Sequence, residues 1–253
     1  MKFILDVHIH TVNSGHAYST VSENAAHAAK IGMGFIGVSD HAPGMPGGAH
    51  LYNFTNLWSQ PDEINGVRIF KGVECNIMSE SGEMDLEPWV LERMDFVIAS
   101  FHRGTFPPSN RETHTRAAIA TMENKDMHIF GHPGDCFFPI DIEAVVEVAA
   151  KTHTIIEINN QSLNPDSYRF NGSEAVQEIL HHCKRLDVPV IAASDAHFCT
   201  SVGDLSRAKE LIIASGIPET LVLNTCPQRF LDAIHKKKTL GFHPNAPQGD
   251  KSP

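Results

Sequence analysis

The chain has 253 residues, of which 42% are hydrophobic and 20% charged, a composition typical of one large globular domain. No apolar run approaches the roughly 18 residues that a membrane span needs, so no membrane partner is expected. The formal net charge of -10 makes nucleic acid an unlikely partner, because such binders normally present a basic face, but it does not exclude small phosphorylated substrates. The sixteen histidines are the compositional outlier.

We do not expect the amino-terminal residues MKFILDVHIH to form a secretory signal, because Asp6 and His8 interrupt the apolar run. We therefore expect a cytoplasmic protein. The five cysteines are scattered and form no CxxC motif, which argues against a disulfide framework and against a thiolate metal site.

Short β-branched and apolar runs alternate with amphipathic stretches along the whole chain, which predicts an α/β fold built from βα units. Strands are predicted at 3–8, 35–39, 67–73, 96–100, 128–131, 155–158 and 188–193, with a weaker signal for an eighth at 221–223. A helix opens at the capping box of Thr20 and Glu23 and stops at Gly32. Further helices are predicted at 111–124, 141–151, 173–186, 204–215 and 227–237.

The connections at 42–66 and 76–93 are unusually long, and long loops in a compact domain commonly belong to a functional site. We expect these two segments to form the walls of that site. The predicted domain spans residues 1–240, followed by a tail at 241–253 whose Pro, Asn, Gly and Lys content allows disorder.

The first strand contains the strongest local motif, Asp6-Val-His8-Ile-His10. Side chains alternate along a strand, so His8 and His10 share a face on which two imidazoles can hold one cation. Such a pair is weak evidence alone, since structural histidines are common. His16 lies in the loop that follows, where Gly15 would let the backbone fold back over the site.

Side chains that can bind metal also follow most of the later strands: His41, Glu74, His102, His132, and Asp195 with His197. In a β/α barrel the carboxyl ends of all strands converge on one mouth, so these distant residues can meet there. Nine donors exceed what one ion uses, and the carboxylate of Glu74 can bridge two cations. The set therefore predicts a multinuclear metal site.

The other histidines are interpreted as structural, because they lie on predicted helices, at a strand start or in connections: His27, His50, His114, His128, His153, His181, His182, His235 and His243. Cys75 follows Glu74, so strand alternation turns its thiol away from the site.

These motifs resemble those of PHP-domain proteins, named for polymerase and histidinol phosphatase, and among them the small stand-alone phosphatases of the YcdX type. The resemblance covers residues 1–240 and rests on the HxH pair, His16, Ser-Asp-His41, Gly-Val-Glu74, Ser-Phe-His102, Gly-His132-Pro and Ser-Asp195-Ala-His197. It implies a single-domain, distorted TIM-like (βα)7 barrel with about three cations at its mouth.

Carried over by position, the resemblance divides the ligands among three ions. His8, His10, Glu74 and Asp195 would hold the first, Glu74 with His102 and His132 the second, and His16, His41 and His197 the third. Zinc is the implied metal, although a nitrogen-rich site with a bridging carboxylate also accepts Mn²⁺ or Fe²⁺. The resemblance also suggests a homo-oligomer, a trimer.

The hypothesis that follows is metal-dependent hydrolysis of a small phosphate monoester. Glu74 and Asp195 are the candidate catalytic residues, because they would position the hydroxide that the cations generate. Arg103, beside His102, is a candidate phosphate clamp, since a guanidinium offers a planar fork to phosphate oxygens. A surface arginine with its own salt bridge is the competing interpretation.

Alternative functions stay open at this point. The enzyme could be specific for histidinol phosphate. An amidohydrolase also uses an HxH motif, but it usually has a bridging lysine where Glu74 or His102 stand. A nuclease or proofreading phosphodiesterase is disfavoured by the acidic charge and the lack of attached domains. A non-catalytic metal-binding protein would hold metal without hydrolysing any phosphate ester.

Overall fold

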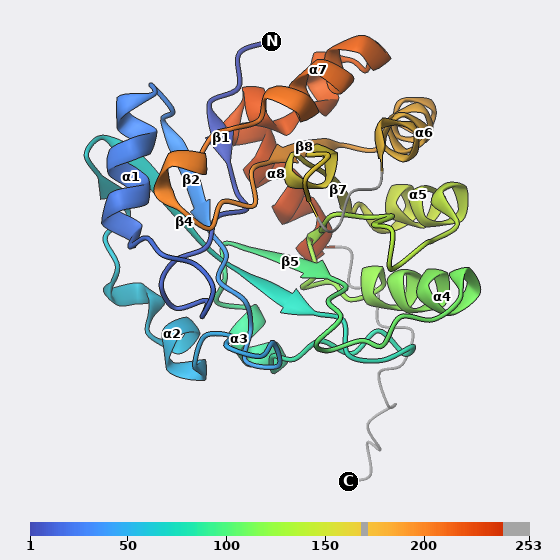
Figure 1. The fold of residues 1–253 in the computed structure, drawn as a ribbon, viewed down its shortest axis with the longest axis horizontal. Helices are drawn as coiled ribbons and strands as arrows, with labels where there is room; N and C mark the ends of the chain where they lie inside the picture. The colour runs from blue at the N-terminus through green and yellow to red at the C-terminus, as the bar shows by residue number, and fades with distance from the viewer. Residues whose placement is uncertain (168–171, 240–253) are drawn as a thin grey trace, which may run out of the picture.

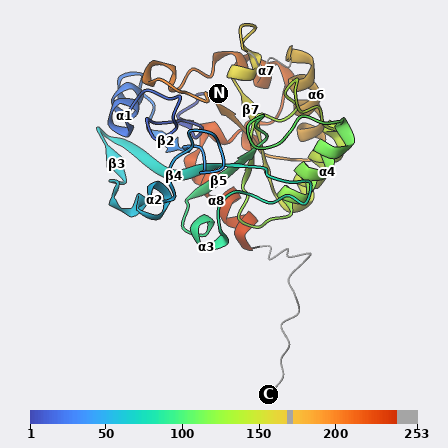
Figure 2. The same ribbon diagram turned by 60° about the horizontal axis from the view of Figure 1, so that its bottom comes forward.

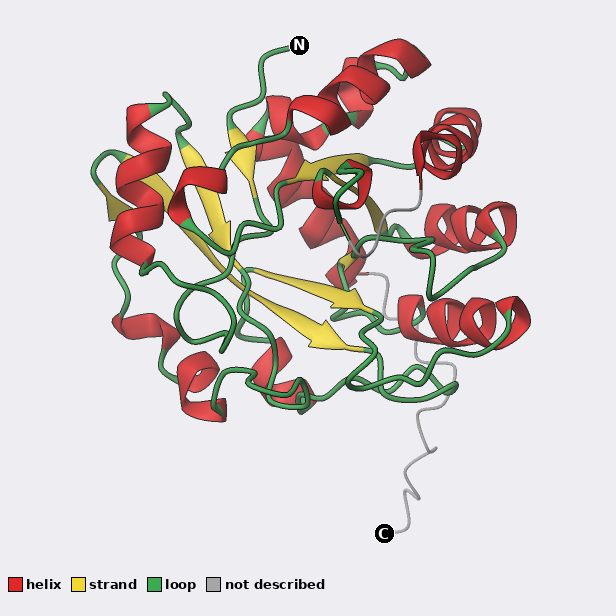
Figure 3. Cartoon of the chain, viewed as in Figure 1, coloured by secondary structure: helices red, strands yellow, loops and turns green. Residues whose placement is uncertain are grey.

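The computed structural model describes residues 1–167 and 172–239, in which helices surround a central barrel of strands (Figures 1 and 3). The tail predicted at 241–253 lies outside the described residues. The parallel strands are β1 (Leu5–Asp6), β2 (Phe35–Val38), β4 (Val67–Asn76), β5 (Phe96–Ser100), β6 (Ile129–Phe130), β7 (Ile155–Asn159) and β8 (Val190–Ala193). The helices are α1 (Val21–Lys30), α2 (Leu51–Thr55), α3 (Pro88–Leu91), α4 (Arg111–Met122), α5 (Ile142–Thr152), α6 (Gly172–Arg185), α7 (Ser206–Ser215) and α8 (Pro227–Thr239).

The parallel strands follow one another around the barrel in the order β1-β2-β4-β5-β6-β7-β8, and the short β3 (Glu63–Ile64) pairs antiparallel with β4. Each parallel pair is joined by a crossover that returns the chain to the same end, so all carboxyl ends face one mouth. The predicted single-domain, distorted (βα)7 barrel is confirmed. Among the described residues, no helix has the length and apolar character to cross a membrane.

The seven predicted strands are present with ends within two residues of those predicted, except at one end of β4, and the eighth is absent. β4 extends to Asn76, so Glu74 lies inside a strand rather than after it. The eighth strand expected at 221–223 is wrong, because this segment forms the 3-10 turns Glu219–Leu221 and Leu223–Thr225 and makes only an isolated bridge between Val222 and Val190.

That segment instead fills the gap between β1 and β8. The Asn224 side chain donates to the carbonyl oxygens of Leu5 (2.8 Å) and Ala192 (2.7 Å) and accepts from the amide of Ala192 (2.7 Å). Nearer the mouth the two strand ends pair directly, with a bridge from Ile9 to Ala196. One side chain thus replaces ladder hydrogen bonds where the barrel does not close, which satisfies buried backbone groups.

The lower half of the barrel interior is apolar. Leu5, Phe70, Phe96 and Ile129 pack inside it, together with Ile155 and Ile191 from the later strands. Helix α8 closes the amino-terminal end and inserts Phe230 and Ile234 into the same cluster (Figure 2). A second apolar layer lies between the barrel and the outer helices, as the burial of Ile36, Phe130 and Ile212 illustrates.

The predicted helices are all present, and their ends follow the expected chemistry. Thr20 accepts from the amide of Glu23 while the Glu23 carboxylate accepts from the Thr20 amide, which confirms the capping box. Asn110 and Asp141 cap α4 and α5 with side-chain oxygens that accept from the amides of Thr113 and Ala144. The loop at 42–66 contains α2 and β3, and the loop at 76–93 contains α3, so neither is structureless.

The ring of Phe96 occupies space that two glycines leave open. A Cβ added to Gly72 would lie 2.3 Å from Cζ of Phe96, and one added to Gly37 would lie 2.7 Å from it.

We expect Gly72→Ala to lower the free energy of unfolding by about 1–3 kcal/mol, because the buried ring cannot shift without strain. Denaturant unfolding measures this. Gly34→Ala is the control, since no atom lies within 4 Å of its added Cβ; equal stability of the two variants would contradict the packing argument.

Candidate metal centre

The predicted metal-binding residues meet at the mouth of the barrel, and the register of the strands explains why. The bridge from Ile9 to Ala196 sets His8 and His10 beside Asp195 and His197, and a bridge from His41 to Glu74 joins the ends of β2 and β4. β5 and β6 bring in His102 and His132 from the side next to β4.

Glu74 lies at the centre of the cluster, with 0% of its surface exposed. Its Oε1 lies 3.3 Å from Nε2 of His102 and 3.1 Å from Nε2 of His132. Its Oε2 lies 3.3 Å from Nε2 of His8 and 3.5 Å from Nε2 of His10. Oε2 also lies 2.7 Å from Nδ1 of His41. The two oxygens therefore face different sets of imidazoles, as a carboxylate that bridges two cations would.

Asp195 is a second carboxylate beside the first pair of imidazoles. Its Oδ1 lies 3.5 Å from Nε2 of His8 and 3.2 Å from Nε2 of His10. Two ligand atoms that each lie about 2.1 Å from one tetrahedral zinc ion are about 3.4 Å apart. The donor atoms of His8, His10, Glu74 and Asp195 thus have the separations of ligands that share an ion.

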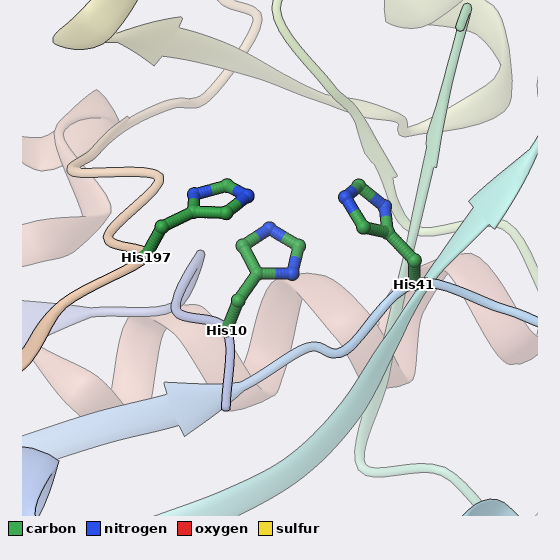
Figure 4. Close-up of side chains that lie close together, drawn as sticks. All are labelled: His10, His41 and His197. Atoms are coloured by element: carbon green, nitrogen blue, oxygen red, sulfur yellow. The ribbon is translucent and has the colours of Figure 1, made fainter. Parts of the chain in front are cut away.

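A third group of imidazoles lies further out. His10, His41 and His197 come from three separate segments and turn toward one another, with donor atoms within 4.8 Å (Figure 4). His16 joins them from the loop after β1, with its Nε2 2.9 Å from Nε2 of His197. His16 is exposed and His197 partly so, whereas His10 and His41 are buried.

Hydrogen bonds to Nδ1 fix several of the rings with Nε2 free for a cation. Nδ1 of His102 lies 2.7 Å from Oδ1 of Asn76, and Nδ1 of His197 lies 2.9 Å from the Asp195 carbonyl oxygen. Nδ1 of His10 faces the Ser14 hydroxyl at 3.2 Å. Each contact favours the tautomer with its proton on Nδ1, so the lone pair of Nε2 points into the cluster.

The buried polar atoms at the centre of the cluster are arranged as metal ligands rather than as hydrogen-bond partners of one another. Within the described residues these lack a hydrogen-bond partner: His8 Nε2, His10 Nε2, His41 Nδ1, His102 Nε2 and Glu74 Oε2. Unpaired buried polar atoms are costly and rare in folded proteins. Imidazole nitrogens around carboxylate oxygens are also a donor set that zinc accepts.

Comparison with known proteins agrees with this geometry. The model of the PHP domain family matches residues 6–163. The chain belongs to the PHP domain family. A probable phosphatase of Thermoanaerobacter sp. (strain X514) is 44% identical over 239 residues, which cover 94% of this chain and 97% of that one. A probable phosphatase of Acetivibrio thermocellus is 41% identical over 94% of this chain and 98% of its own.

A solved structure shares the fold at low sequence identity. The histidinol phosphate phosphatase of Lactococcus lactis, in complex with zinc, L-histidinol and phosphate, aligns with a TM-score of 0.58 and 18% identity. The alignment covers 85% of this chain and 94% of that one.

The pKa values of several residues in the cluster of this PHP domain are shifted in directions that favour cation binding. Burial lowers the pKa of His102 to about 4 and lowers the pKa of His10 well below its usual value. Burial alone would raise the pKa of Glu74, but His8, His102 and His41 hold it well below its usual range. At neutral pH His10 and His102 are therefore neutral and Glu74 is ionised, the forms that bind metal.

His8 differs from the other imidazoles. Burial alone would lower its pKa, but the carboxylates of Glu157, Glu74 and Asp195 outweigh burial and raise the pKa well above its usual value. A cation that binds at Nε2 of His8 would displace that proton, so metal binding here competes with protonation.

Two buried carboxylates beside the cluster are not among the site residues predicted from the sequence. Glu157 lies inside β7, with its Oε1 2.6 Å from Nδ1 of His8. Asp40 accepts from the amide of Thr11 (2.7 Å) and from the Ser14 hydroxyl (2.8 Å), which folds the loop that carries His16. Two sequence features could have indicated them: an acidic residue within the apolar run Ile155-Ile-Glu-Ile, and an acidic residue directly before His41.

Gly15 folds the same loop through a close contact between two backbone segments. Its φ is not in the left-handed region, but its amide donates to the Gly47 carbonyl oxygen at 2.6 Å. A Cβ at Gly15 would lie 2.9 Å from that oxygen. The glycine thus permits a close approach of two backbones rather than a special turn.

A cavity of about 600 Å³ opens above the cluster. Its wall corrects the expectation for the two long loops: among the described lining residues, the loop at 42–66 contributes Met45 and the loop at 76–93 contributes none. Apart from His41 after β2 and His102 after β5, the other lining residues come from the segments after β1, β7 and β8, and include Tyr18, Gln161, Asn164, Asp166, Ser167, Phe198 and Ser201.

Arg103, the predicted phosphate clamp, is exposed, and its guanidinium stacks on the ring of Phe137 with its Cζ 4.6 Å from the ring centroid. It is not among the described residues that line the cavity. Cys75 is buried in the apolar cluster that contains Val73 and Ala42, and Cys75, Cys183, Cys199 and Cys226 are free thiols.

The histidines interpreted as structural lie away from the cluster where the structure describes them. Nε2 of His114 accepts from the Ser109 amide, His50 caps α2, and Nδ1 of His128 accepts from the Val97 amide. His243 lies outside the described residues.

β6 provides a matched pair of histidines that tests the cluster. His132 follows this strand and contacts Glu74, whereas His128 precedes it and is equally buried at the opposite end. We expect His132→Gln to remove about one bound ion per chain, because a cation there loses a ligand, and His128→Gln to leave the metal content unchanged. Elemental analysis of both purified proteins measures this. Equal metal content in the two variants would exclude His132 as a ligand.

Proposed function

We propose that this PHP domain protein is a metal-dependent phosphatase that hydrolyses a small phosphate monoester at a centre of about three divalent cations. The observation that carries the proposal is Glu74, whose Oε1 lies within 3.3 Å of two imidazoles and whose Oε2 faces three others at 2.7, 3.3 and 3.5 Å. The curated relatives that cover almost the whole chain are named probable phosphatases, which supports the same reaction class.

The donor geometry is compatible with the division of ligands that the family resemblance implies, with His41 placed between two groups, because its donor atoms lie near those of His10 and His197 and also near those of Glu74 and His102. His8, His10 and Asp195 would share a first cation with one oxygen of Glu74. His102 and His132 would hold a second with its other oxygen. His16, His41 and His197 would hold a third. The zinc in the histidinol phosphate phosphatase structure supports zinc as the metal.

Bound divalent cations would supply Lewis acidity and activate water for attack on phosphorus. The protein's own residues provide the setting. Glu74 and Asp195 orient a water at the cluster, because their carboxylate oxygens accept its hydrogen bonds. Asn159 holds Asp195, since its amide donates to Oδ2 at 3.3 Å.

The charge of the cavity indicates that cations bound at the cluster, rather than lysine or arginine side chains, would neutralise the phosphate. A phosphate monoester carries up to two negative charges, yet none of the described lining residues is lysine or arginine, and two are aspartates. A cavity of this charge would repel phosphate without bound cations, so this charge pattern favours a phosphatase whose anion site is the metal centre itself.

The other residues of the cavity wall indicate which leaving group the site would accommodate. Tyr18 and Phe198 are largely exposed at its rim, and Asp166 adds a carboxylate. A ring-bearing or cationic leaving group would suit these residues better than a second anion. Histidinol phosphate is one such compound, and the Lactococcus lactis neighbour supports it as a candidate.

The decisive experiment compares wild type with Glu74→Ala in metal content and in turnover of a phosphomonoester panel. We expect the variant to lose at least one ion per chain and to lose turnover by at least about 10³-fold, because the shared carboxylate is gone. Glu80→Ala is the control, since this exposed glutamate pairs with Arg116 away from the cluster. Near-normal turnover by Glu74→Ala would contradict the bridging role.

The same panel separates the alternatives. Bound metal in the wild type without hydrolysis of any phosphate ester would indicate a metal-binding protein. Hydrolysis of amide or phosphodiester substrates alone would indicate an amidohydrolase or a nuclease.

Arg103 is proposed as an outer phosphate contact. Arg103→Ala should raise KM for phosphomonoesters several-fold with little change in kcat, because a uniform ground-state contact would be removed. Steady-state kinetics with Arg111→Ala as a control measure this, since Arg111 is an exposed arginine whose Nε donates to the Ile140 carbonyl oxygen. An unchanged KM for every phosphomonoester tested would exclude the clamp.

A further inference from the structure

Glu157 is a buried carboxylate to which the proposed reaction assigns no role. It lies on the interior face of β7, between Ile156 and Ile158 in sequence, with 1% of its surface exposed. Within the described residues its carboxylate pairs with no lysine or arginine, and its ion-pair partner is His8. A buried carboxylate is costly unless its surroundings use its charge and its lone pairs.

Both oxygens of Glu157 are occupied by groups that belong to the metal centre. Oε1 lies 2.6 Å from Nδ1 of His8. Oε2 accepts from the backbone amide of His132 at 2.5 Å and from the Asn159 side chain at 3.2 Å. The same Asn159 amide donates to Oδ2 of Asp195 at 3.3 Å. One carboxylate is thus connected to three candidate metal ligands from three different strand ends.

The contact with His8 determines which ring nitrogen can bind metal. A carboxylate accepts only, so the proton of His8 must lie on Nδ1 to make this hydrogen bond. Nε2 then presents its lone pair toward Glu74 and Asp195, at 3.3 and 3.5 Å. Such carboxylate–histidine pairs orient the ring and make it a stronger ligand.

The contact with His132 holds an unusual backbone. His132 has a φ of +28°, in the left-handed region that residues other than glycine rarely adopt. The hydrogen bond from its amide to Glu157 fixes the peptide in this conformation, from which Nε2 of His132 reaches Oε1 of Glu74 at 3.1 Å. Strained conformations persist only where neighbouring contacts determine them.

We propose that Glu157 is a positioning residue of the metal centre, which orients His8 and His132 together and so couples the two cations that share Glu74. This role rests on the proposed metal centre. It predicts that loss of the carboxylate weakens metal binding at both ligands at once, although Glu157 touches no cation itself.

Glu157→Gln tests the role with nearly unchanged volume. Glutamine offers one acceptor oxygen where His8 and the His132 amide require two, so one of these donors must face an NH₂ group. The full-length chain loaded with Co²⁺ is titrated with a chelator of known affinity while the visible spectrum of the bound cobalt is recorded. We expect the variant to release cobalt at 10- to 100-fold lower chelator concentration, with an altered spectrum that reports a changed ligand geometry.

Asp135→Asn is the matched control. Asp135 is also buried, at 3% exposure, and its Oδ1 accepts from the amides of Phe137 and Phe138 rather than from any of the nine candidate ligands. Its cobalt affinity should stay within about twofold of wild type. Glu157→Asp is a second variant that keeps the charge, and it should bind more tightly than Glu157→Gln but less tightly than wild type, because the shorter side chain cannot reach both partners.

The outcomes separate the two proposals. Wild type that binds no Co²⁺ would overturn the metal centre itself. Wild type that binds Co²⁺ while Glu157→Gln and Glu157→Asp match its affinity and spectrum would overturn the positioning role and leave the metal centre intact. If Glu157→Gln does not fold, weaker binding and an altered spectrum in Glu157→Asp support the role, and a wild-type result in that variant excludes it.

Discussion

The carboxylate of Glu74 lies fully buried at the mouth of the barrel, and most of the surrounding structure compensates its charge. Neither lysine nor arginine lies beside it among the ion pairs of the described residues; imidazoles from four strand ends do. An ionised carboxylate in such a place is stable only if positive charge meets both oxygens. Cations held by these imidazoles would meet that requirement, so the proposed metal centre would also compensate the buried charge of Glu74.

The barrel interior is divided accordingly. Its lower half is packed with aliphatic and aromatic side chains and closed by Phe230 and Ile234 of α8. Its upper half is polar, with Glu74, Glu157 and Asn159 on the same inward faces of strands β4 and β7 that carry Phe70 and Ile155 lower down. Strand alternation makes this possible, because inward positions repeat every second residue and change character along the strand. The rigid lower half holds the polar half in register.

The candidate site could be predicted from sequence where a residue's position in its element is enough. His41, His102 and His132 each follow a recognisable apolar strand, and parallel strands deliver their carboxyl ends to one mouth. Glu157 and Asp40 could not be selected in this way, because their roles depend on which hydrogen-bond donors face them. The prediction that the two longest loops form the cavity wall was wrong for a similar reason, because the length of a loop does not determine where its residues lie. The segments after β7 and β8 form most of the described wall instead.

The sequence by itself determined the alternation of strands and helices, the capping box at Thr20, and the set of imidazole and carboxylate donors, since each depends on local periodicity and residue chemistry. Only the tertiary structure decided that 221–225 is a turn whose Asn224 spans the gap between β1 and β8, that Gly72 leaves room for the ring of Phe96, and that Glu157 joins His8 to His132. These features depend on contacts between residues up to 219 positions apart. Such contacts are fixed by how the whole barrel closes, which no local pattern encodes.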